Sequence, residues 1–257
     1  MSTTILVTGG TGTLGRHVVP LLRAAGREVR VLSRRGGAAA DGVEYVACDL
    51  LGGEGIDAAL AGVDTVLHLA GGPKGDDVAT RNLVAAAARA GVAHLVYISV
   101  IGADRIPLGY FRAKWNAERA VEESGVPWTT LRAAQFHDLA LTVAGKMAGL
   151  PLVPAPGGLR WQPVDARDVA ARLVELALGE PAGRVRDLAG PTLYGLHELA
   201  LDHRRASGRR SRPTLPVRMP GKVGRAYRAG ANLSLDDVDT GGRTWEAFLA
   251  ERVGGAR

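Results

Sequence analysis

The sequence predicts a doubly wound parallel α/β sheet with a small C-terminal lobe. Short β-branched runs alternate with alanine-rich segments of helical period, a glycine-rich turn follows the first run, and the alternation weakens after residue 132. Such alternation produces parallel strands joined by right-handed crossover helices. We therefore expect a single domain over residues 1–257, with the lobe built mainly from about 136–164 and 190–257.

The expected strands are apolar nearly throughout, as a sheet that is covered on both faces requires. They are Thr4–Thr8, Val29–Ser33, Val43–Ala47, Thr65–Leu69, His94–Ser99 and Trp128–Arg132. The helices expected between them are Leu14–Ala25, Asp57–Ala61, Asp77–Ala90 and Tyr110–Ser124. Gly91 and Gly125 stand just after helical runs, where glycine commonly ends a helix.

The C-terminal part is less regular. Residues 149–164 are rich in proline and glycine, which predicts a loop with short strands. The segment DARDVAARLVELAL then resumes a helix, with Asp165 as the expected N-cap and Asp168 in the first turn, where negative charge is favourable. The segment TWEAFLAER predicts a short amphipathic helix that packs on the lobe.

Composition excludes several functional classes. No apolar run approaches the roughly 20 residues that cross a bilayer, and the N-terminus has no signal pattern, so a cytoplasmic protein without membrane association is expected. The single cysteine, Cys48, allows no internal disulfide and no zinc-type cluster, so we expect a structural thiol and no metal.

The formal net charge of +6 does not by itself predict a nucleic-acid partner, because the arginines are scattered along the chain. The one local basic cluster, Asp202–Arg212, has no aromatic residue that could stack on bases. A solvated surface loop is the favoured interpretation of this cluster, and no nucleic-acid binding is expected.

The segment TILVTGGTGTLGRHVV places glycines between a strand and a helix. In this context glycines permit a tight turn and let the main chain approach a pyrophosphate, while the N-terminus of the helix supplies N–H groups. The segment therefore predicts a dinucleotide-binding turn. The residues expected to contact the nucleotide here are Gly9, Thr11, Gly12, Thr13, Leu14 and Gly15.

The end of the second strand indicates which dinucleotide binds. An NAD enzyme usually carries an acid there, whereas this chain has Ser33, Arg34 and Arg35, which suit a 2′-phosphate. NADP(H) is therefore the expected cofactor, and the alternative is that the arginines are ordinary surface charges. After the third strand, Asp49, followed by Leu50, either accepts from the adenine amine or forms an Asx turn.

The motifs TGGTGTLG, VLSRR, CDL, HLAGG and YFRAKWNAE, in this order, resemble the short-chain dehydrogenase/reductase superfamily in its atypical NmrA-like branch. The likeness covers nearly the whole chain, including SGVPWTTLRAAQF and VDARDVA. It implies a Rossmann-type NADP(H) domain with a small-molecule substrate held by the C-terminal lobe. The branch contains reductases of carbonyls, enones and quinones, and also regulators that bind a dinucleotide without catalysis.

Tyr110 and Lys114 are the leading catalytic candidates, because a spacing of four residues places them on one helical face. A lysine ammonium near the phenol lowers the pKa of the tyrosine, so that Tyr110 can donate a proton to a carbonyl oxygen whose carbon receives a hydride. The resemblance implies that Lys114 also holds the nicotinamide ribose. The alternative makes Tyr110 an amphipathic-helix residue and Lys114 a surface charge.

Ser99 is the third candidate, as a hydrogen-bond donor to the substrate carbonyl. Relatives often carry this serine one or two residues later, where this chain has Val100 and Ile101. Ser99 is therefore either catalytic, a residue of the strand end, or a contact of the nicotinamide.

Two further segments follow strands at the edge where ligands bind in this topology. After the fourth strand, main-chain contacts to the ribose are expected from Leu69, Ala70, Gly71 and Gly72, whereas a structural role is favoured for His68. After the sixth strand, the residues expected to line the nicotinamide or substrate are Gln135, Phe136 and His137.

Three functions remain open on the sequence. The first is an NADPH-dependent reductase of a small carbonyl, enone or quinone, and the second is a non-enzymatic NADP(H)-binding redox sensor. A sugar-nucleotide epimerase is less attractive, because the chain is short for the substrate lobe of such enzymes. The oligomeric state is expected to be a monomer or a homodimer.

Overall fold

The computed structural model describes residues 4–39, 42–72 and 75–254. The chain forms two compact units. Unit 1 comprises Met1–Ser99, Arg112–Arg132 and Val169–Val185. Unit 2 comprises Val100–Phe111, Ala133–Asp168 and Arg186–Arg257.

Unit 1 is built on a parallel sheet whose six main strands run in the order β6-β5-β4-β1-β2-β3. These strands are β1 (Thr4–Thr8), β2 (Glu28–Ser33), β3 (Val43–Ala47), β4 (Val63–His68), β5 (His94–Val100) and β6 (Trp128–Ala133). The chain passes from β1 outward to β3 and then crosses back to β4, so the strand order reverses between β1 and β4. Ligands bind at such a switch point in open α/β sheets.

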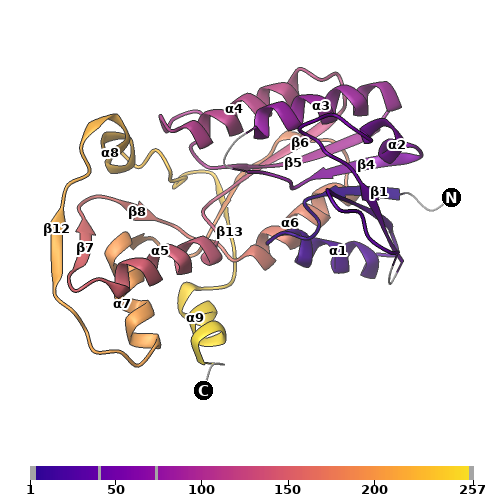
Figure 1. Ribbon diagram of the computed structural model, residues 1–257. Coiled ribbons are helices and arrows are strands. Elements are labelled where there is room, and N and C mark those ends of the chain that lie inside the picture. Colours follow the sequence, from indigo (N-terminus) through magenta and orange to yellow (C-terminus); the bar gives the residue numbers. More distant parts are fainter. Residues whose placement is uncertain (1–3, 40–41, 73–74, 255–257) are drawn as a thin grey trace. The chain divides into compact units, whose positions relative to one another are not determined.

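Helices cover both faces of this sheet, with α3 and α4 on one face and α1 and α6 on the other (Figure 1). The helices are α1 (Gly15–Ala24), α2 (Ile56–Leu60), α3 (Asp76–Ala90), α4 (Gly109–Glu122) and α6 (Ala166–Leu178). The short strand β9 (Gly183–Arg184) pairs with β6. This architecture confirms the predicted α/β class, and each of the six strands and four helices predicted before residue 133 is present, with ends within two residues of the prediction.

The core of unit 1 lies where the sheet meets α3 and α4. Leu6, Val66 and Leu95 from adjacent strands are fully buried against Leu83 of α3 and Ala117 of α4. Burying one such leucine or valine stabilises the fold by about 1.5–3 kcal/mol. The apolar strands thus fix the sheet, and the sheet fixes the positions of the loops that follow each strand.

Unit 2 contains the segments predicted for the lobe. Its helices are α5 (His137–Gly149), α7 (Leu196–Ala206), α8 (Gly221–Arg228) and α9 (Trp245–Gly254). Its short strands are β7 (Val153–Pro156), β8 (Arg160–Trp161), β10 (Asp187–Ala189), β11 (Tyr194–Gly195), β12 (Thr214–Val217) and β13 (Val238–Thr240). The expected short strands of the proline- and glycine-rich segment are therefore confirmed.

Small residues bring the helices of unit 2 close together. Ala140, Ala144 and Ala148 recur every four residues on one face of α5 and are fully buried in a cluster with Leu199 of α7. The C-terminal helix α9 adds Trp245, which is also fully buried, so its predicted packing on this part of the chain is confirmed.

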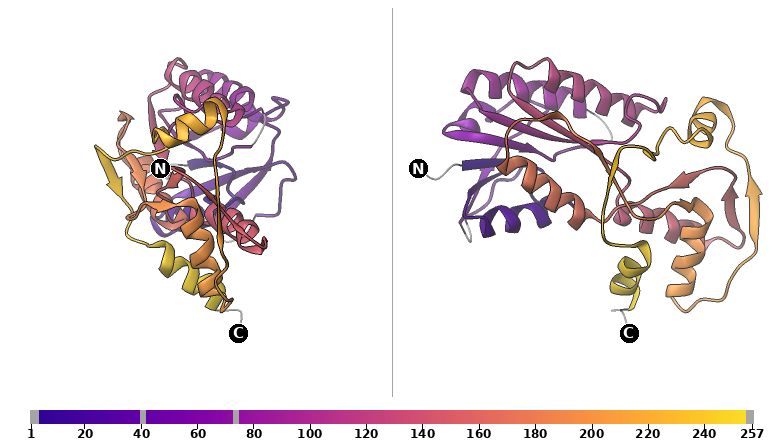
Figure 2. Two further views of the ribbon diagram at one scale, coloured as in Figure 1. Left: turned by 90° about the vertical axis from the view of Figure 1, so that its left-hand side faces the viewer. Right: turned by 180° about the vertical axis from the view of Figure 1, so that it is seen from behind.

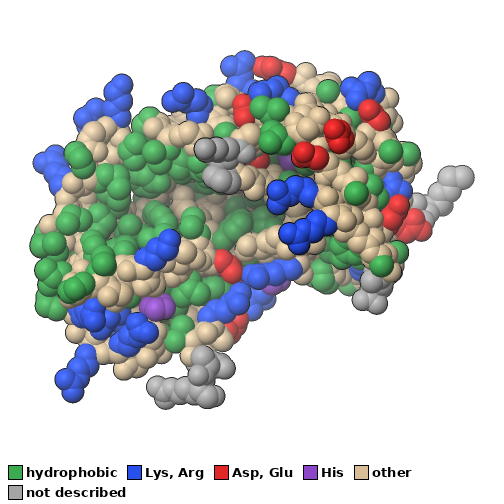
Figure 3. Space-filling model, in the orientation of Figure 1, with side chains coloured by type: hydrophobic (Ala, Val, Ile, Leu, Met, Phe, Trp, Pro, Cys, Tyr) green, Lys and Arg blue, Asp and Glu red, His purple; other side chains and the backbone are tan. Residues whose placement is uncertain are grey.

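Strands β7 and β12 lie side by side and pair in parallel, as the right-hand view of Figure 2 shows. Figure 3 shows hydrophobic side chains gathered over these two strands. The exposed apolar residues in and beside them are Leu150, Leu152, Leu215, Val217 and Met219.

The basic cluster Asp202–Arg212 differs from the expected surface loop. Its first residues lie in α7, and Arg204 is buried. The Arg204 guanidinium donates to the carbonyl oxygens of Ala148 and Arg210, and Arg212 donates to that of Gly149. These arginines bind carbonyl groups that would otherwise lack partners, which explains part of the local positive charge.

Within the described ranges, no helix combines the length and the apolar character that crossing a lipid bilayer requires.

Candidate functional site

The carboxyl ends of β1 to β5 meet at one edge of the unit 1 sheet, because all of these strands are parallel. The loops that leave this edge carry the residues predicted to bind the nucleotide. Gly9 to Gly15 follow β1, Arg34 and Arg35 follow β2, Asp49 and Leu50 follow β3, and Leu69 to Gly71 follow β4. The structure therefore brings these segments of unit 1 together along the edge.

Two glycines of the β1–α1 turn leave no room for a side chain. Gly9 has a φ of +66°, and a Cβ atom on it would lie 2.8 Å from the backbone nitrogen of Ala70. A Cβ on Gly15 would lie 2.3 Å from the backbone of Gly10. The first contact packs the turn against the exit of β4, and the second packs the start of α1 against the turn. Thr11 and Thr13 are exposed beside this start, and Leu14 is buried at the N-cap.

Thr8 and His68 link the ends of β1 and β4. The Thr8 hydroxyl accepts hydrogen bonds from the backbone N–H groups of Leu69 and Ala70, at 3.1 and 2.9 Å. The Thr8 hydroxyl therefore donates its own proton to His68 Nδ1, which lies 2.7 Å away. On the other side of the ring, the Thr80 hydroxyl donates to the Asp76 carbonyl and so accepts from His68 Nε2–H at 3.0 Å.

This arrangement holds His68 as a neutral ring with its proton on Nε2. A second proton, on Nδ1, would face a hydroxyl whose two lone pairs are already used. Burial, and then the charge of Lys114, lower the pKa of His68 to about 3. This geometry matches the structural interpretation of His68. Through the Thr8 hydroxyl, His68 helps to hold the main chain at Leu69 and Ala70.

We expect His68 to make the protein sensitive to acid. Its pKa is about 3 in the folded state and near 6.5 in the unfolded chain, so the unfolded chain binds more protons between these values and stability falls as the pH drops below about 6.5. Between pH 7 and pH 5 this residue should remove about 2 kcal/mol from the free energy of unfolding. Urea unfolding at pH 7 and at pH 5 measures this decrease in the free energy of unfolding. The decrease should be smaller in the variant His68→Gln.

The half-exposed His197 provides the control for this experiment. The variant His197→Gln should show the same loss between pH 7 and pH 5 as the unmodified protein. An equal loss in His68→Gln would mean that His68 does not carry the effect.

The segment after β2 leaves two guanidinium groups available. Arg34 and Arg35 are exposed, and among the described residues their side chains have no hydrogen-bond or ion-pair partner. Ser33 accepts a hydrogen bond from the Arg35 backbone N–H at 3.3 Å, which shapes the turn. Asp49 accepts one from the Leu51 backbone N–H at 3.1 Å, so the Asx turn that was one of its two interpretations is formed.

Lys114 is buried in unit 1, in contrast to the surface-charge interpretation. Its ammonium lies 3.1 Å from the Asp76 carboxylate and donates to the Tyr97 hydroxyl at 3.2 Å and to the Ile98 carbonyl at 3.3 Å. A Cβ atom on Gly71 would lie 3.0 Å from the same ammonium. The cation therefore lies directly against the loop after β4, at the edge of the sheet where the carboxyl ends of β1 to β5 meet.

Ser99 is buried in β5, one residue before the end of the strand. Among the described residues its hydroxyl has no hydrogen-bond partner. A buried hydroxyl without a partner is costly, and a ligand that accepts from it would remove that cost.

Tyr110, Gln135, Phe136 and His137 belong to unit 2. Tyr110 lies in the first turn of α4, with 41 % of its surface exposed and its ring edge-on to Phe111. Gln135 is buried, and its side-chain oxygen has no partner within the described part of the chain. Phe136 is partly buried at the N-cap of α5.

His137 is fully buried in unit 2, with its ring against Trp245 and Phe248. Its Nε2 donates to the Pro163 carbonyl at 3.1 Å, and Nδ1 lies 3.6 Å from the Asp165 carboxylate. Burial lowers the pKa of His137, although Asp165 acts in the opposite direction. Its predicted role as a lining residue stays a prediction.

The N-cap predicted for α6 is present. The Asp165 carboxylate accepts the backbone N–H of Arg167 at 2.8 Å. Burial alone would raise the pKa of Asp165, but the hydrogen bonds and charge of Arg167 hold it at about 2. Asp168 binds the backbone N–H and the guanidinium of Arg243.

Sequence reasoning missed several residues of this region, among them Asp76 and Thr8. Asp76 is the first residue of α3, where an acid is expected from the helix dipole alone, so its pairing with Lys114 left no pattern in the sequence. Thr8 reads as an ordinary β-branched strand residue. Among the described residues, no group of three or more His, Cys, Asp or Glu could hold a metal ion.

A comparison with known families identifies the family of the chain. The sequence pattern of the family described as NAD(P)H-binding matches residues 9–178, which is more than half of the chain. The chain belongs to the NAD(P)H-binding family. The match begins at the first glycine of the β1–α1 turn and includes Lys114.

The curated relatives of this NAD(P)H-binding protein include three reductases. A (4-alkanoyl-5-oxo-2,5-dihydrofuran-3-yl)methyl phosphate reductase from Streptomyces griseus is 36% identical over 80% of this chain and 74% of its own. An NAD(P)H azoreductase from Xenophilus azovorans is 34% identical, with the same two coverages. Quinone oxidoreductase 2 from Escherichia coli is 30% identical over 80% of this chain and 75% of its own.

Among solved structures, an NADPH-dependent quinone oxidoreductase from Escherichia coli in complex with NADPH superposes with a TM-score of 0.81. The alignment covers 96% of this chain and 99% of that chain at 20% sequence identity. At this identity the likeness shows the fold, which is Rossmann-type.

The residues present fit an NAD(P)H molecule. Gly9 and Gly15 keep the turn free of side chains, and the exposed Arg34 and Arg35 supply cations one strand away. The buried Ser99 hydroxyl and the Lys114 ammonium supply donors at the exits of β5 and β4.

Proposed function

We propose that the protein is an NADPH-dependent oxidoreductase that reduces a small carbonyl, enone or quinone. The observation that carries the proposal is the buried Lys114, whose ammonium lies against Gly71 at the nucleotide edge, four residues after Tyr110 on the same helix. The names of the three relatives, a furan phosphate reductase, an azoreductase and a quinone oxidoreductase, support reduction as the chemistry.

In this proposal NADPH supplies a hydride when it is bound. Gly9 to Gly15 hold its pyrophosphate, Arg34 and Arg35 hold its 2′-phosphate, and Lys114 holds the nicotinamide ribose. Tyr110 donates a proton to the oxygen of the reduced group, and Lys114 stabilises the phenolate left behind. Ser99 donates a hydrogen bond either to the substrate carbonyl or to the nicotinamide. Gln135, Phe136 and His137 line the nicotinamide or the substrate.

The apolar surface of unit 2 suits an apolar substrate, because several leucine and valine side chains in and beside β7 and β12 are exposed. We also propose that the chain belongs to the NmrA-like branch of the short-chain dehydrogenase/reductases, on the order of its motifs. That branch also contains dinucleotide sensors, so a non-catalytic role is the outcome to be tested against reduction.

The loss of NADPH absorbance with a panel of simple benzoquinones, naphthoquinones, cyclic enones and aldehydes tests the proposal. We expect protein-dependent oxidation with at least one class, and no oxidation with the variant Gly9→Val, whose side chain would collide with Ala70. Tight NADPH binding without oxidation of NADPH by any compound of the panel would contradict the reductase proposal and would favour the non-catalytic sensor.

We expect Arg34→Ala to weaken NADPH far more than NADH. Loss of one charge-assisted hydrogen bond to the 2′-phosphate costs on the order of 1.5–3 kcal/mol, or roughly 10- to 100-fold in the dissociation constant, and NADH has no such phosphate. Fluorescence titration of both cofactors measures the ratio. Arg89→Ala, in the last turn of α3, is the control and should change neither constant. Equal weakening of both cofactors would contradict the role of Arg34.

A further inference from the structure

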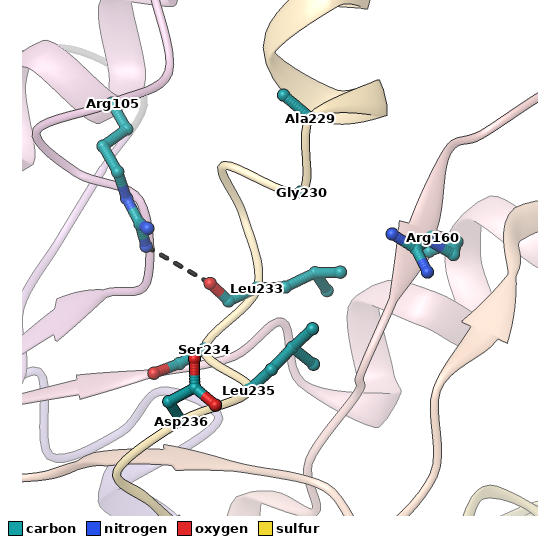
Figure 4. A pocket seen from close by; sticks show the side chains of 8 residues that line it. All are labelled: Arg105, Arg160, Ala229, Gly230, Leu233, Ser234, Leu235 and Asp236. Carbon is teal, nitrogen blue, oxygen red and sulfur yellow. Dashed lines mark hydrogen bonds between the residues drawn. The ribbon is translucent and has the colours of Figure 1, made fainter.

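A pocket of about 270 Å³ lies in unit 2, and none of the residues assigned above to the nucleotide or to catalysis lines it (Figure 4). Its lining residues are Arg105, Arg160, Ala229, Gly230, Leu233, Ser234, Leu235 and Asp236. They come from the loop after β5, from β8 and from the segment that follows α8.

Hydrogen bonds and close packing hold the walls of this pocket. Asn232 is buried, and its side-chain N–H group donates to the Arg160 carbonyl at 2.7 Å, which ties the 229–236 segment to β8. On the other side, Arg105 donates to the Leu233 carbonyl at 3.3 Å. A Cβ on Gly102 would lie 2.4 Å from the Ala231 carbonyl oxygen, so only glycine allows the two loops to approach this closely. These contacts fix the walls of the pocket relative to one another.

Arg160 is the group that this pocket leaves without a partner. Along β8 the side chains alternate, so Trp161 is buried while Arg160 is exposed. Among the described residues the Arg160 guanidinium has no hydrogen-bond or ion-pair partner. Figure 4 shows the side chains of Leu233 and Leu235 pointing toward it, and Leu235 has 61 % of its surface exposed.

The charges around the pocket favour an anion. Arg105 and Arg160 are two cations, and Asp236 is the single acid in the lining. Asp236 makes no ion pair with either arginine in the described part of the chain, so it leaves Arg160 available. Arg105 has Asp104 3.9 Å away and is held by Leu233, so Arg160 is the stronger candidate for direct contact.

We propose that this pocket binds an organic oxyanion, which is a phosphate or carboxylate group carried on an apolar body. The fork of Arg160 can hold two oxygens of such a group, because a guanidinium matches carboxylate and phosphate geometry. The apolar body covers Leu235 and removes its exposed side chain from water. The site goes beyond the proposed reduction, because it is defined by binding and assigns no catalytic step.

Isothermal titration of 1-naphthyl phosphate and 1-naphthoate into protein saturated with NADP⁺ tests the site, since the bound nucleotide occupies the other phosphate-binding residues. Both anions should bind, 1-naphthol should bind much more weakly because it has no charge, and inorganic phosphate should bind weakly because it has no apolar body. Arg160→Gln should weaken both anions roughly 10- to 100-fold. Asp236→Asn should strengthen them, because it removes a like charge.

Arg218→Gln is the matched control, because Arg218 is an exposed arginine of unit 2 that does not line the pocket. The affinity of the Arg218→Gln variant for both anions should equal that of the unmodified protein. Equal losses of anion affinity in Arg160→Gln and Arg218→Gln would show that the effect comes from the overall charge, and would overturn the site. Unchanged anion affinity in Arg160→Gln would also overturn it. Because binding is measured directly, neither result depends on whether the protein reduces quinones.

Discussion

Replacing Tyr110 by phenylalanine is expected to lower the turnover of enone and aldehyde substrates by roughly 100- to 10,000-fold, which is the contribution of a positioned general acid. The phenol lies in the first turn of α4 and has 41 % of its surface exposed, so it can reach a ligand. Removing one oxygen atom leaves the helix intact, and NADPH affinity should not change because Tyr110 holds no part of the cofactor in the proposal.

The size of the loss should depend on the substrate. Hydride addition to an aldehyde produces an alkoxide, a strong base that needs a proton at once. Addition to a quinone produces a hydroquinone anion, a far weaker base that can leave without one. Single-turnover kinetics of NADPH oxidation with both substrate classes should therefore show a larger effect of Tyr110→Phe on aldehydes and enones than on quinones.

Tyr45→Phe is the control for this experiment, because Tyr45 is a partly buried residue of β3 with no assigned role. Its turnover should equal that of the unmodified protein. Unchanged turnover in Tyr110→Phe with every substrate class would remove Tyr110 from the mechanism while leaving NADPH binding and the fold untouched.

The largest expected effect on stability comes from Glu118→Ala. Glu118 of α4 binds Arg132 of β6 through two hydrogen bonds, at 2.8 and 2.6 Å, and both side chains are 1 % exposed. Removing the acid leaves a buried guanidinium without its counter-charge, which costs about 3–5 kcal/mol. The melting temperature should fall on the order of 10 °C, which calorimetry or circular dichroism measures.

The same helix supplies a control pair. Arg119 and Glu123 form an exposed ion pair at 2.8 Å, and Glu123→Ala should leave the melting temperature unchanged because water screens such pairs. The double variant Glu118→Leu with Arg132→Met should recover most of the lost stability, since apolar side chains can replace a buried ion pair. A melting temperature for Glu118→Ala equal to that of Glu123→Ala would show that the buried pair contributes little.

Most of the unit 1 sheet could be predicted from the sequence, because its strands are short, apolar and separated by glycines. β1 and β3 have the predicted bounds. β4 was predicted to reach Leu69 but ends at His68, and just beyond it the backbone N–H groups of Leu69 and Ala70 bind the Thr8 hydroxyl. This contact comes from a side chain of a neighbouring strand, so no pattern within the segment could indicate it.

The candidate site divides in the same way. The positions of the glycine turn and of the arginines after β2 could be predicted, because each depends on a few consecutive residues, and their roles in cofactor binding stay predictions. The environment of Lys114 was not, because its partners Asp76 and Tyr97 lie on other elements. The prediction of a surface loop at Asp202–Arg212 was wrong for the same reason. Arg204 binds the carbonyl of Ala148, which lies far away in the sequence.

The sequence by itself determined the fold class, the tight glycine turn between β1 and α1, and the cap of α6, because these follow from steric limits and hydrogen bonds between near neighbours. Only the tertiary structure decided that Lys114 is a buried cation paired with Asp76, that His68 is a neutral support for the exit of β4, and that Arg160 stands without a partner in a pocket. Those properties depend on burial and on contacts between distant segments, which exist only once the chain has folded.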